Sequence, residues 1–140
     1  MEVPGTPETV FTTIIRPSSW AHWFSIHRAF VHQAPEVLHE GARLVSRVVV
    51  LGVENEFEWT VDTFEAPHRI ILQGTSRTGV RSEFTFWMRP SAAGTTVTIG
   101  GVFTGSHLTT SLAKELENHG REELRRTLEQ LAAATASRQG

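Results

Sequence analysis

The chain has 140 residues, 39 % of them hydrophobic and 20 % charged, and its mass of 15.6 kDa fits one domain over residues 1–140. The 13 basic and 15 acidic side chains leave a net charge of −2, which argues against a nucleic-acid partner. No apolar run reaches the roughly 20 residues of a membrane span, and the first residues lack the pattern of a signal peptide, so we expect a cytoplasmic protein. The absence of cysteine excludes disulfides, thiol catalysis and zinc–thiolate sites.

Two short helices are predicted near the start of the chain. In the first, Thr6 is the expected N-cap and Pro7 the first helical residue. The second covers residues 19–24, with Ser18 or Ser19 as its expected cap. The first helix ends before the Arg16–Pro17 pair, and its apolar face is formed by Val10, Phe11 and Ile14.

The middle of the chain reads as strands in which apolar and polar residues alternate. Such alternation, repeated with short connections, predicts an antiparallel sheet with one solvated face. The Gly100–Gly101 pair within the last of these strands predicts a bulge or a sharp bend. The expected strands cover residues 43–51, 55–64, 69–74, 80–88 and 95–104.

The last predicted element is a long amphipathic helix. Gly120 stands in its apolar stripe, where a leucine is expected, and a glycine inside a helix costs about 1 kcal/mol relative to alanine. We therefore expect Gly120 to allow a close backbone contact, a kink or a space under the helix. The leucines of the stripe are Leu108, Leu112, Leu116, Leu124, Leu128 and Leu131. The exposed side is expected to carry the ion pairs Glu117–Arg121, Glu122–Arg126 and Arg125–Glu129.

These elements together predict an α+β fold. A single amphipathic helix on the concave face of a curved antiparallel sheet buries the apolar faces of both. With the two short helices closing one end, this arrangement encloses an apolar cavity.

Six segments of the chain follow one another in a recognisable order: residues 3–11, 20–24, 37–43, 57–61, 95–103 and the last helix. Together they resemble the START-like or polyketide cyclase/dehydrase (SRPBCC) superfamily, and in particular small actinobacterial members, some of them toxins of toxin–antitoxin pairs. The resemblance implies a helix-grip fold around a cavity that binds lipids, polyketides or other hydrophobic molecules, without a cofactor. In this family a first strand precedes the first helix, and here it is either very short, within residues 1–3, or begins upstream.

The resemblance makes the aromatic residues of the concave face candidates for the wall of the cavity, although aromatic residues at this spacing most often form plain core. The function we expect is therefore the binding of a hydrophobic small molecule, as a carrier or a sensor, with affinity drawn from apolar burial. The candidate ligand-binding residues are Trp20, Trp23, Phe24, His27, Phe30, Phe57, Trp59, Phe84, Phe86, Phe103, Leu116 and Gly120.

An alternative is a cofactor-independent cyclase or dehydratase. Related cyclases are described as using a cavity arginine and a tyrosine, and in our alignment Thr63 and His27 occupy those positions, in a chain that has no tyrosine. His27 is then the candidate catalytic acid–base, since an ordinary histidine pKa near 6.5 suits proton transfer. A second alternative, implied by the resemblance alone, is a toxin-type protein-interaction module.

Other chemistry finds little support in the sequence. His22, His27 and His32 share no helical face and no acidic partner completes a metal motif, so no metal site is expected. Trp87 is expected on the outer face of the sheet, where an exposed tryptophan suggests a contact such as a homodimer. The arginines expected to share that solvated face are Arg43, Arg47, Arg81 and Arg89.

Overall fold

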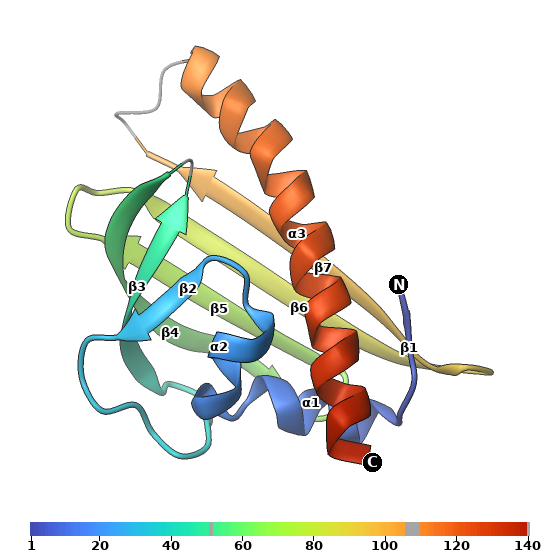
Figure 1. Cartoon of the computed structure of the whole chain (residues 1–140). Helices are drawn as coiled ribbons and strands as arrows, with labels where there is room; N and C mark the ends of the chain where they lie inside the picture. Colours follow the sequence, from blue (N-terminus) through green and yellow to red (C-terminus); the bar gives the residue numbers. More distant parts are fainter. Residues whose placement is uncertain (51, 106–109, 140) are drawn as a thin grey trace.

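One curved antiparallel sheet and a long helix that crosses its concave face make up most of the computed structural model of this chain (Figure 1). The structure describes residues 1–50, 52–105 and 110–139. In chain order the elements are β1 (Glu2–Val3), α1 (Pro7–Ile14), the 3-10 helix η1 (Pro17–Ser19), α2 (Trp20–Trp23), β2 (His27–Phe30), β3 (Arg43–Val50), β4 (Val53–Glu65), β5 (Arg69–Ser76), β6 (Arg81–Ser91), β7 (Gly94–Thr104) and α3 (Thr110–Gln139). The strands lie in the order β1-β7-β6-β5-β4-β3-β2.

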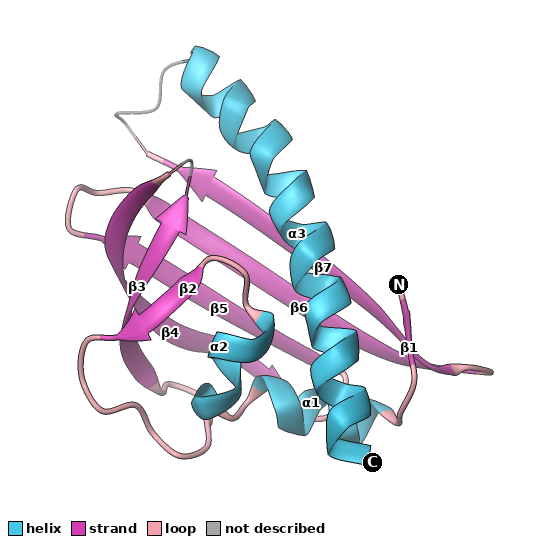
Figure 2. Cartoon of the chain, viewed as in Figure 1, coloured by secondary structure: helices cyan, strands magenta, loops and turns pink. Residues whose placement is uncertain are grey.

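The α+β helix-grip prediction is confirmed. All five strands expected in the middle of the chain are present, and the first strand is the very short β1, which pairs with β7. The edge strand β2 was not among the expected strands, because four residues with two exposed side chains show no clear alternation. Figure 2 shows α3 lying across the sheet, with α1 and α2 beside its C-terminal half. No helix in the described residues is long and apolar enough to cross a membrane.

The two short helices form largely as expected. The Thr9 amide donates to the Thr6 hydroxyl at 3.3 Å, which confirms the cap of α1. Ser19 takes the N-cap position of α2, as expected, but its hydroxyl does not bond to the helix. It donates instead to the carbonyl oxygens of Thr13 and Arg16, at 2.6 and 2.7 Å. The same hydroxyl accepts from the Trp23 indole N–H at 2.8 Å. Ser19 therefore ties α2 to the end of α1.

The expected bulge at Gly100–Gly101 is wrong. The β6–β7 ladder runs without interruption from the Arg81–Thr104 pair to the Ser91–Gly94 pair. Bulges occur instead between Val61 and Thr63 in β4 and between His27 and Ala29 in β2. At Gly101 the glycine instead makes room for the Phe84 ring, which a Cβ would approach to 2.9 Å.

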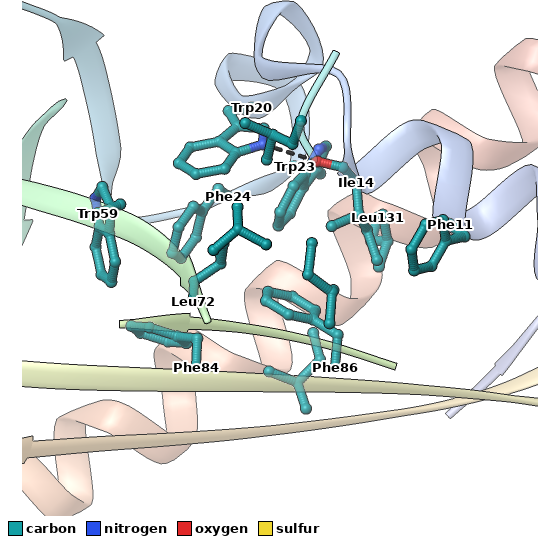
Figure 3. Close-up of a cluster of buried hydrophobic side chains, with 14 of the residues drawn as sticks. Phe11, Ile14, Trp20, Trp23, Phe24, Trp59, Leu72, Phe84, Phe86 and Leu131 are labelled. Atoms are coloured by element: carbon teal, nitrogen blue, oxygen red, sulfur yellow. Dashed lines mark hydrogen bonds between the residues drawn. The ribbon is translucent and has the colours of Figure 1, made fainter. Parts of the chain in front are cut away.

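Aromatic side chains of α2 and of the sheet meet in the centre of the core (Figure 3). The Trp20 indole N–H donates to the Ile14 carbonyl oxygen at 2.9 Å, so its buried polar atom is satisfied. The Trp23 ring meets Phe86 edge to face, with 5.8 Å between ring centres. Leu131 of α3 closes this cluster from the other side and is fully buried. The contacts hold the C-terminal half of α3 against the sheet.

The apolar stripe of α3 faces the core where its side chains are described. Leu124 and Leu128 pack against the buried cluster, whereas the side chains of Leu108, Leu112 and Leu116 lie outside the described part of the structure. On the exposed side, two of the expected ion pairs form, Glu117–Arg121 at 3.0 Å and Arg125–Glu129 at 2.6 Å. The expected Glu122–Arg126 pair is wrong, since Glu122 binds Arg125 and Arg126 lies 3.7 Å from Glu123.

A glycine in β5 makes room for the largest side chain of β4. Trp59 and Gly74 are direct cross-strand partners. A Cβ atom on Gly74 would lie 2.7 Å from two atoms of the Trp59 ring. The indole therefore lies directly over the glycine backbone, and its N–H donates to the Ser46 hydroxyl at 3.0 Å.

We expect Gly74→Ala to lower the free energy of unfolding by about 1–3 kcal/mol, because the added methyl group overpacks the core against Trp59. Urea unfolding followed by tryptophan fluorescence measures the change. Gly100→Ala is the matched control, since a Cβ there meets nothing within 4 Å, and it should cause no loss of stability. Equal losses in the two variants would contradict this account.

Candidate functional site

A pocket of about 360 Å³ lies between the sheet and the N-terminal half of α3. One wall comes from β3, β6, β7 and the segment after α2, and the other comes from α3. Exposed residues of both walls, among them Val102 and Arg121, are part of its lining, so the pocket is open to solvent. The lining residues are Phe24, Ile26, Val50, Phe84, Gly101, Val102, Phe103, Glu117, His119, Gly120, Arg121, Glu123, Leu124 and Thr127.

The sheet side of the pocket is apolar and aromatic. Phe24 and Phe84 meet edge to face with 5.2 Å between ring centres, and Phe84 meets Phe103 in the same way at 6.0 Å. A Cβ on Gly101 would lie 2.9 Å from the Phe84 ring and 3.4 Å from a methyl carbon of Leu124. Gly101 is thus needed for Phe84 to occupy its place in the wall.

The helix side of the pocket is hollow at Gly120. A Cβ built on Gly120 meets nothing within 4 Å among the described residues. Gly120 lies on the same stripe as Leu124, one turn before it in α3. A larger side chain here would extend into the pocket. The room that the sequence led us to expect at this glycine is therefore present.

The α3 wall also carries charge near the opening. Glu117 and Arg121 pair at 3.0 Å, and the His119 imidazole lies 3.4 Å from the Glu123 carboxylate. Only 15 % of the Glu123 side chain is exposed. The pocket therefore combines an apolar wall with a polar rim on the helix.

A hydrogen-bonded cluster fixes the segment after α2 to this part of α3. The Ser25 amide donates to the Thr127 hydroxyl at 3.2 Å, and the two hydroxyl groups are 2.9 Å apart. The Ser25 hydroxyl also donates to the Glu123 carboxylate. Because Thr127 is only 3 % exposed, these bonds satisfy polar groups that the pocket wall would otherwise leave buried without partners.

The structure brings four of the twelve expected ligand-binding residues to this pocket, namely Phe24, Phe84, Phe103 and Gly120. The side chain of Leu116 lies outside the described part of the structure. The other seven lie elsewhere: Trp20, Trp23, His27, Phe30, Phe57, Trp59 and Phe86.

Most of those seven aromatic residues form packed core or a layer behind the pocket wall. Trp59 lies 5.7 Å from Phe84 between ring centres, and Phe57 lies 6.3 Å from Phe103. Trp20 and Trp23 are fully buried between α1, α2 and the sheet (Figure 3). These rings support the wall from behind and do not line the space themselves.

His27 lies at the start of β2, away from the pocket lining. Its ring is 4.4 Å from that of Phe30 and 5.8 Å from that of Trp20 between centres. The residue is 6 % exposed, and its Nδ1 atom has no hydrogen-bond partner in the described part of the chain. Burial, with a smaller contribution from the neighbouring charge of Arg28, lowers the pKa of His27 to about 4. The imidazole is therefore neutral at pH 7.

The sequence did not single out several residues that line the pocket. Ile26 and Val50 are ordinary apolar residues, and nothing in their local pattern marks them. The sequence does contain a pattern that could have identified the lining residues of α3. These residues stand three, four or seven positions from Gly120, and they are Glu117, Glu123, Leu124 and Thr127. Residues at those spacings share a helix face with the unexpected glycine.

The apolar wall of the pocket can bury an apolar molecule, and the charged side chains of α3 at its rim can bind a polar group. In the described residues, no cluster of three histidine, aspartate or glutamate side chains is arranged to hold a metal ion. The Ser25, Glu123 and His119 side chains do not form a nucleophilic triad, because the carboxylate stands between the hydroxyl and the imidazole.

A curved sheet that grips a long helix around an apolar pocket defines the helix-grip class of ligand-binding domains. Within that class, the chain belongs to the family described as polyketide cyclase/dehydrase and lipid transport, which it matches over residues 1–136.

Two proteins of Mycobacterium tuberculosis and one solved structure illustrate the similarity. Uncharacterized protein Rv1546 is 27 % identical over 104 residues, which cover 71 % of this chain and 73 % of that protein. Toxin Rv0910 is 28 % identical over 97 residues, covering 69 % and 67 %. Protein CV1439 of Chromobacterium violaceum is 18 % identical with a TM-score of 0.71, covering 95 % and 91 %. The last likeness shows the shared fold.

The low pKa of His27 predicts a loss of stability in mild acid. In the unfolded chain His27 becomes protonated near pH 6.5, whereas in the folded protein it becomes protonated only near pH 4. The contribution of His27 to the free energy of unfolding is therefore complete above pH 6.5, and it decreases by up to about 3 kcal/mol as the pH falls to 4.

Urea unfolding at several pH values tests this prediction. His27→Leu should lose less stability than the wild type between pH 6.5 and pH 4, because leucine does not titrate. His22→Gln, at an exposed histidine, is the control and should follow the wild type. Parallel curves for His27→Leu and the wild type would show that His27 is not the group responsible.

Proposed function

We propose that the protein binds a hydrophobic, lipid- or polyketide-like small molecule in the pocket between β7 and α3, as a carrier or a sensor. The family and the fold support a ligand-binding role. The pocket volume of about 360 Å³ falls within the range of roughly 300–1,000 Å³ typical of small-molecule sites. Apolar burial in such a pocket contributes about 25 cal/mol per Å², before the losses on association.

The observation that carries the proposal is the hollow at Gly120. Alanine at a helix interior position is more stable than glycine by about 1 kcal/mol. At Gly120 a Cβ would meet no atom of the described residues within 4 Å, so contacts within that part of the chain do not explain the glycine. Space for a bound molecule does explain it, because this position lies in the pocket wall.

The cyclase alternative receives less support from the geometry. His27, its candidate acid–base, is buried between Trp20 and Phe30 and is not part of the pocket lining. Thr63, at the position of the cyclase arginine, lies at the β4 bulge and donates its hydroxyl proton to the Asp62 carboxylate at 3.2 Å. An acid–base residue must lie within hydrogen-bonding reach of its substrate.

The toxin alternative rests on the relatives of Mycobacterium tuberculosis that are named toxins, such as Toxin Rv0910. A toxin-type interaction module would arrest growth when overproduced in a mycobacterial host, and coexpression of a partner encoded beside it would restore growth. Normal growth of the overproducing cells would count against this role.

The ligand-binding proposal is tested by filling the pocket from Gly120. Gly120→Phe should occupy the hollow and raise the dissociation constant for the apolar dye Nile red at least about tenfold, equivalent to 1.4 kcal/mol. Gly120→Ala is the matched control, since it adds one methyl group, improves helix propensity and leaves most of the space. It should bind the dye as the wild type does.

Native mass spectrometry of gently purified protein provides a second measurement. The wild type and Gly120→Ala should carry a discrete excess mass that disappears on denaturation, and Gly120→Phe should lack it. If Nile red binds equally to all three proteins, or if Gly120→Phe retains the same cargo, the pocket is not the binding site.

A further inference from the structure

Strand β7 is an open edge of the sheet over most of its length. Its outer neighbour, β1, covers only the Thr95–Thr96 segment, and the backbone of Met1 adds bonds to Val97 at 2.8 and 2.9 Å. Beyond Val97, no described strand pairs with the outer side of β7. An uncovered edge strand presents a row of free backbone donors and acceptors that favours pairing with another chain.

The bonds of Val97 show which backbone groups point outward. The N–H and C=O of Val97 both point toward β1, away from β6. In an antiparallel ladder this direction alternates, so the N–H and C=O groups of Ile99, Gly101 and Phe103 also point to the open side. Those of Thr98, Gly100 and Val102 point back to β6.

The open segment lacks the features with which proteins usually protect an edge. Residues 98–104 contain no charged side chain, no proline and no bulge. Val102 is 57 % exposed on the outer face, although it is apolar. Two residues away, a Cβ on Gly100 would meet nothing within 4 Å. An exposed apolar side chain and an empty position thus lie side by side on one face of the strand.

We infer that this edge pairs with the same edge of a second copy of the chain, antiparallel, around a two-fold axis at Gly101. In this register Gly101 faces its own copy, and Ile99 of each chain faces Phe103 of the other. These are three pairs that each exchange two backbone hydrogen bonds. The result is one continuous sheet shared by two protomers.

In this register the side chains of β7 are complementary to those of the second copy. Val102 of each copy lies over the empty position at Gly100 of the other, and Thr98 lies opposite Thr104. Threonine pairs and aromatic–β-branched pairs such as Phe103 with Ile99 are favourable cross-strand neighbours. A shift by one residue in each copy would move the axis away from Gly101 and separate Val102 from Gly100.

Other surfaces of the described chain fit a second copy less well. Trp87, the residue that first suggested a dimer, is flanked by the guanidinium groups of Arg69 and Arg89, at 5.0 and 5.6 Å from the ring centre. The opposite edge, β2, is four residues long and carries the exposed charge of Arg28. Self-pairing there would bring two such charges together.

Analytical ultracentrifugation from about 1 μM to about 1 mM, the range of weak complexes, tests the proposal. The mass of the wild type should rise with concentration from 15.6 kDa toward twice that value. Val102→Glu should raise the dissociation constant at least about tenfold, because it places two carboxylates beside one axis. Val53→Glu is the matched control, since Val53 is 58 % exposed, and it should dimerise like the wild type.

Amide hydrogen exchange measured by NMR tests the same register without any substitution. At high concentration the amides of Ile99, Gly101 and Phe103 should become protected, and on dilution they should exchange at least about tenfold faster. Those of Thr98, Gly100 and Val102, bonded to β6, should stay protected throughout. A wild type that remains a monomer, a Val102→Glu dimer as tight as the wild type, or protection of the outward amides that does not depend on concentration would each overturn the proposal.

Discussion

The aromatic cluster of α2, formed by Trp20, Trp23 and Phe24, sets the distance between the long helix and the sheet. Its rings meet Phe86 and Phe84 of the sheet edge to face at 5.8 and 5.2 Å, and Ser25 directly after it is hydrogen-bonded to α3. The helix is therefore fixed where the cluster fills the space beneath it. Closer to the N-terminus of α3, the pocket separates the helix from the sheet.

Glycine residues decide how the aromatic rings are distributed around this space. Gly74 lets Trp59 lie flat on β5, and Gly101 lets Phe84 take its place in the pocket wall. Gly120 has the opposite effect, because a Cβ there would meet no atom of the described residues within 4 Å. Gly74 and Gly101 thus permit close packing of aromatic rings, whereas Gly120 leaves a space open.

Alternation and helical spacing were sufficient to predict the architecture, because both follow from burying one face of each element. These patterns could not distinguish aromatic residues that line the pocket from those that form only core. Trp23 and Phe24 are neighbours in the sequence, yet Trp23 lies in the core and Phe24 also lines the pocket. That difference depends on the path of α3, which only tertiary packing fixes. His27 shows the same limit: its residue type fits proton transfer, whereas its burial between Trp20 and Phe30 depends on the turn that leads into β2.

The pairing of β1 with β7 has a consequence for how the chain acquires its structure during synthesis. The cross-strand partners of Glu2 and Val3 are Thr96 and Thr95, which follow more than ninety residues later. β1 therefore cannot pair until β7 has left the ribosome. The concave face stays uncovered longer still, because α3 follows β7 in the chain. A nascent chain of this protein thus exposes its aromatic face until α3 has emerged from the ribosome, and molecular chaperones bind such surfaces.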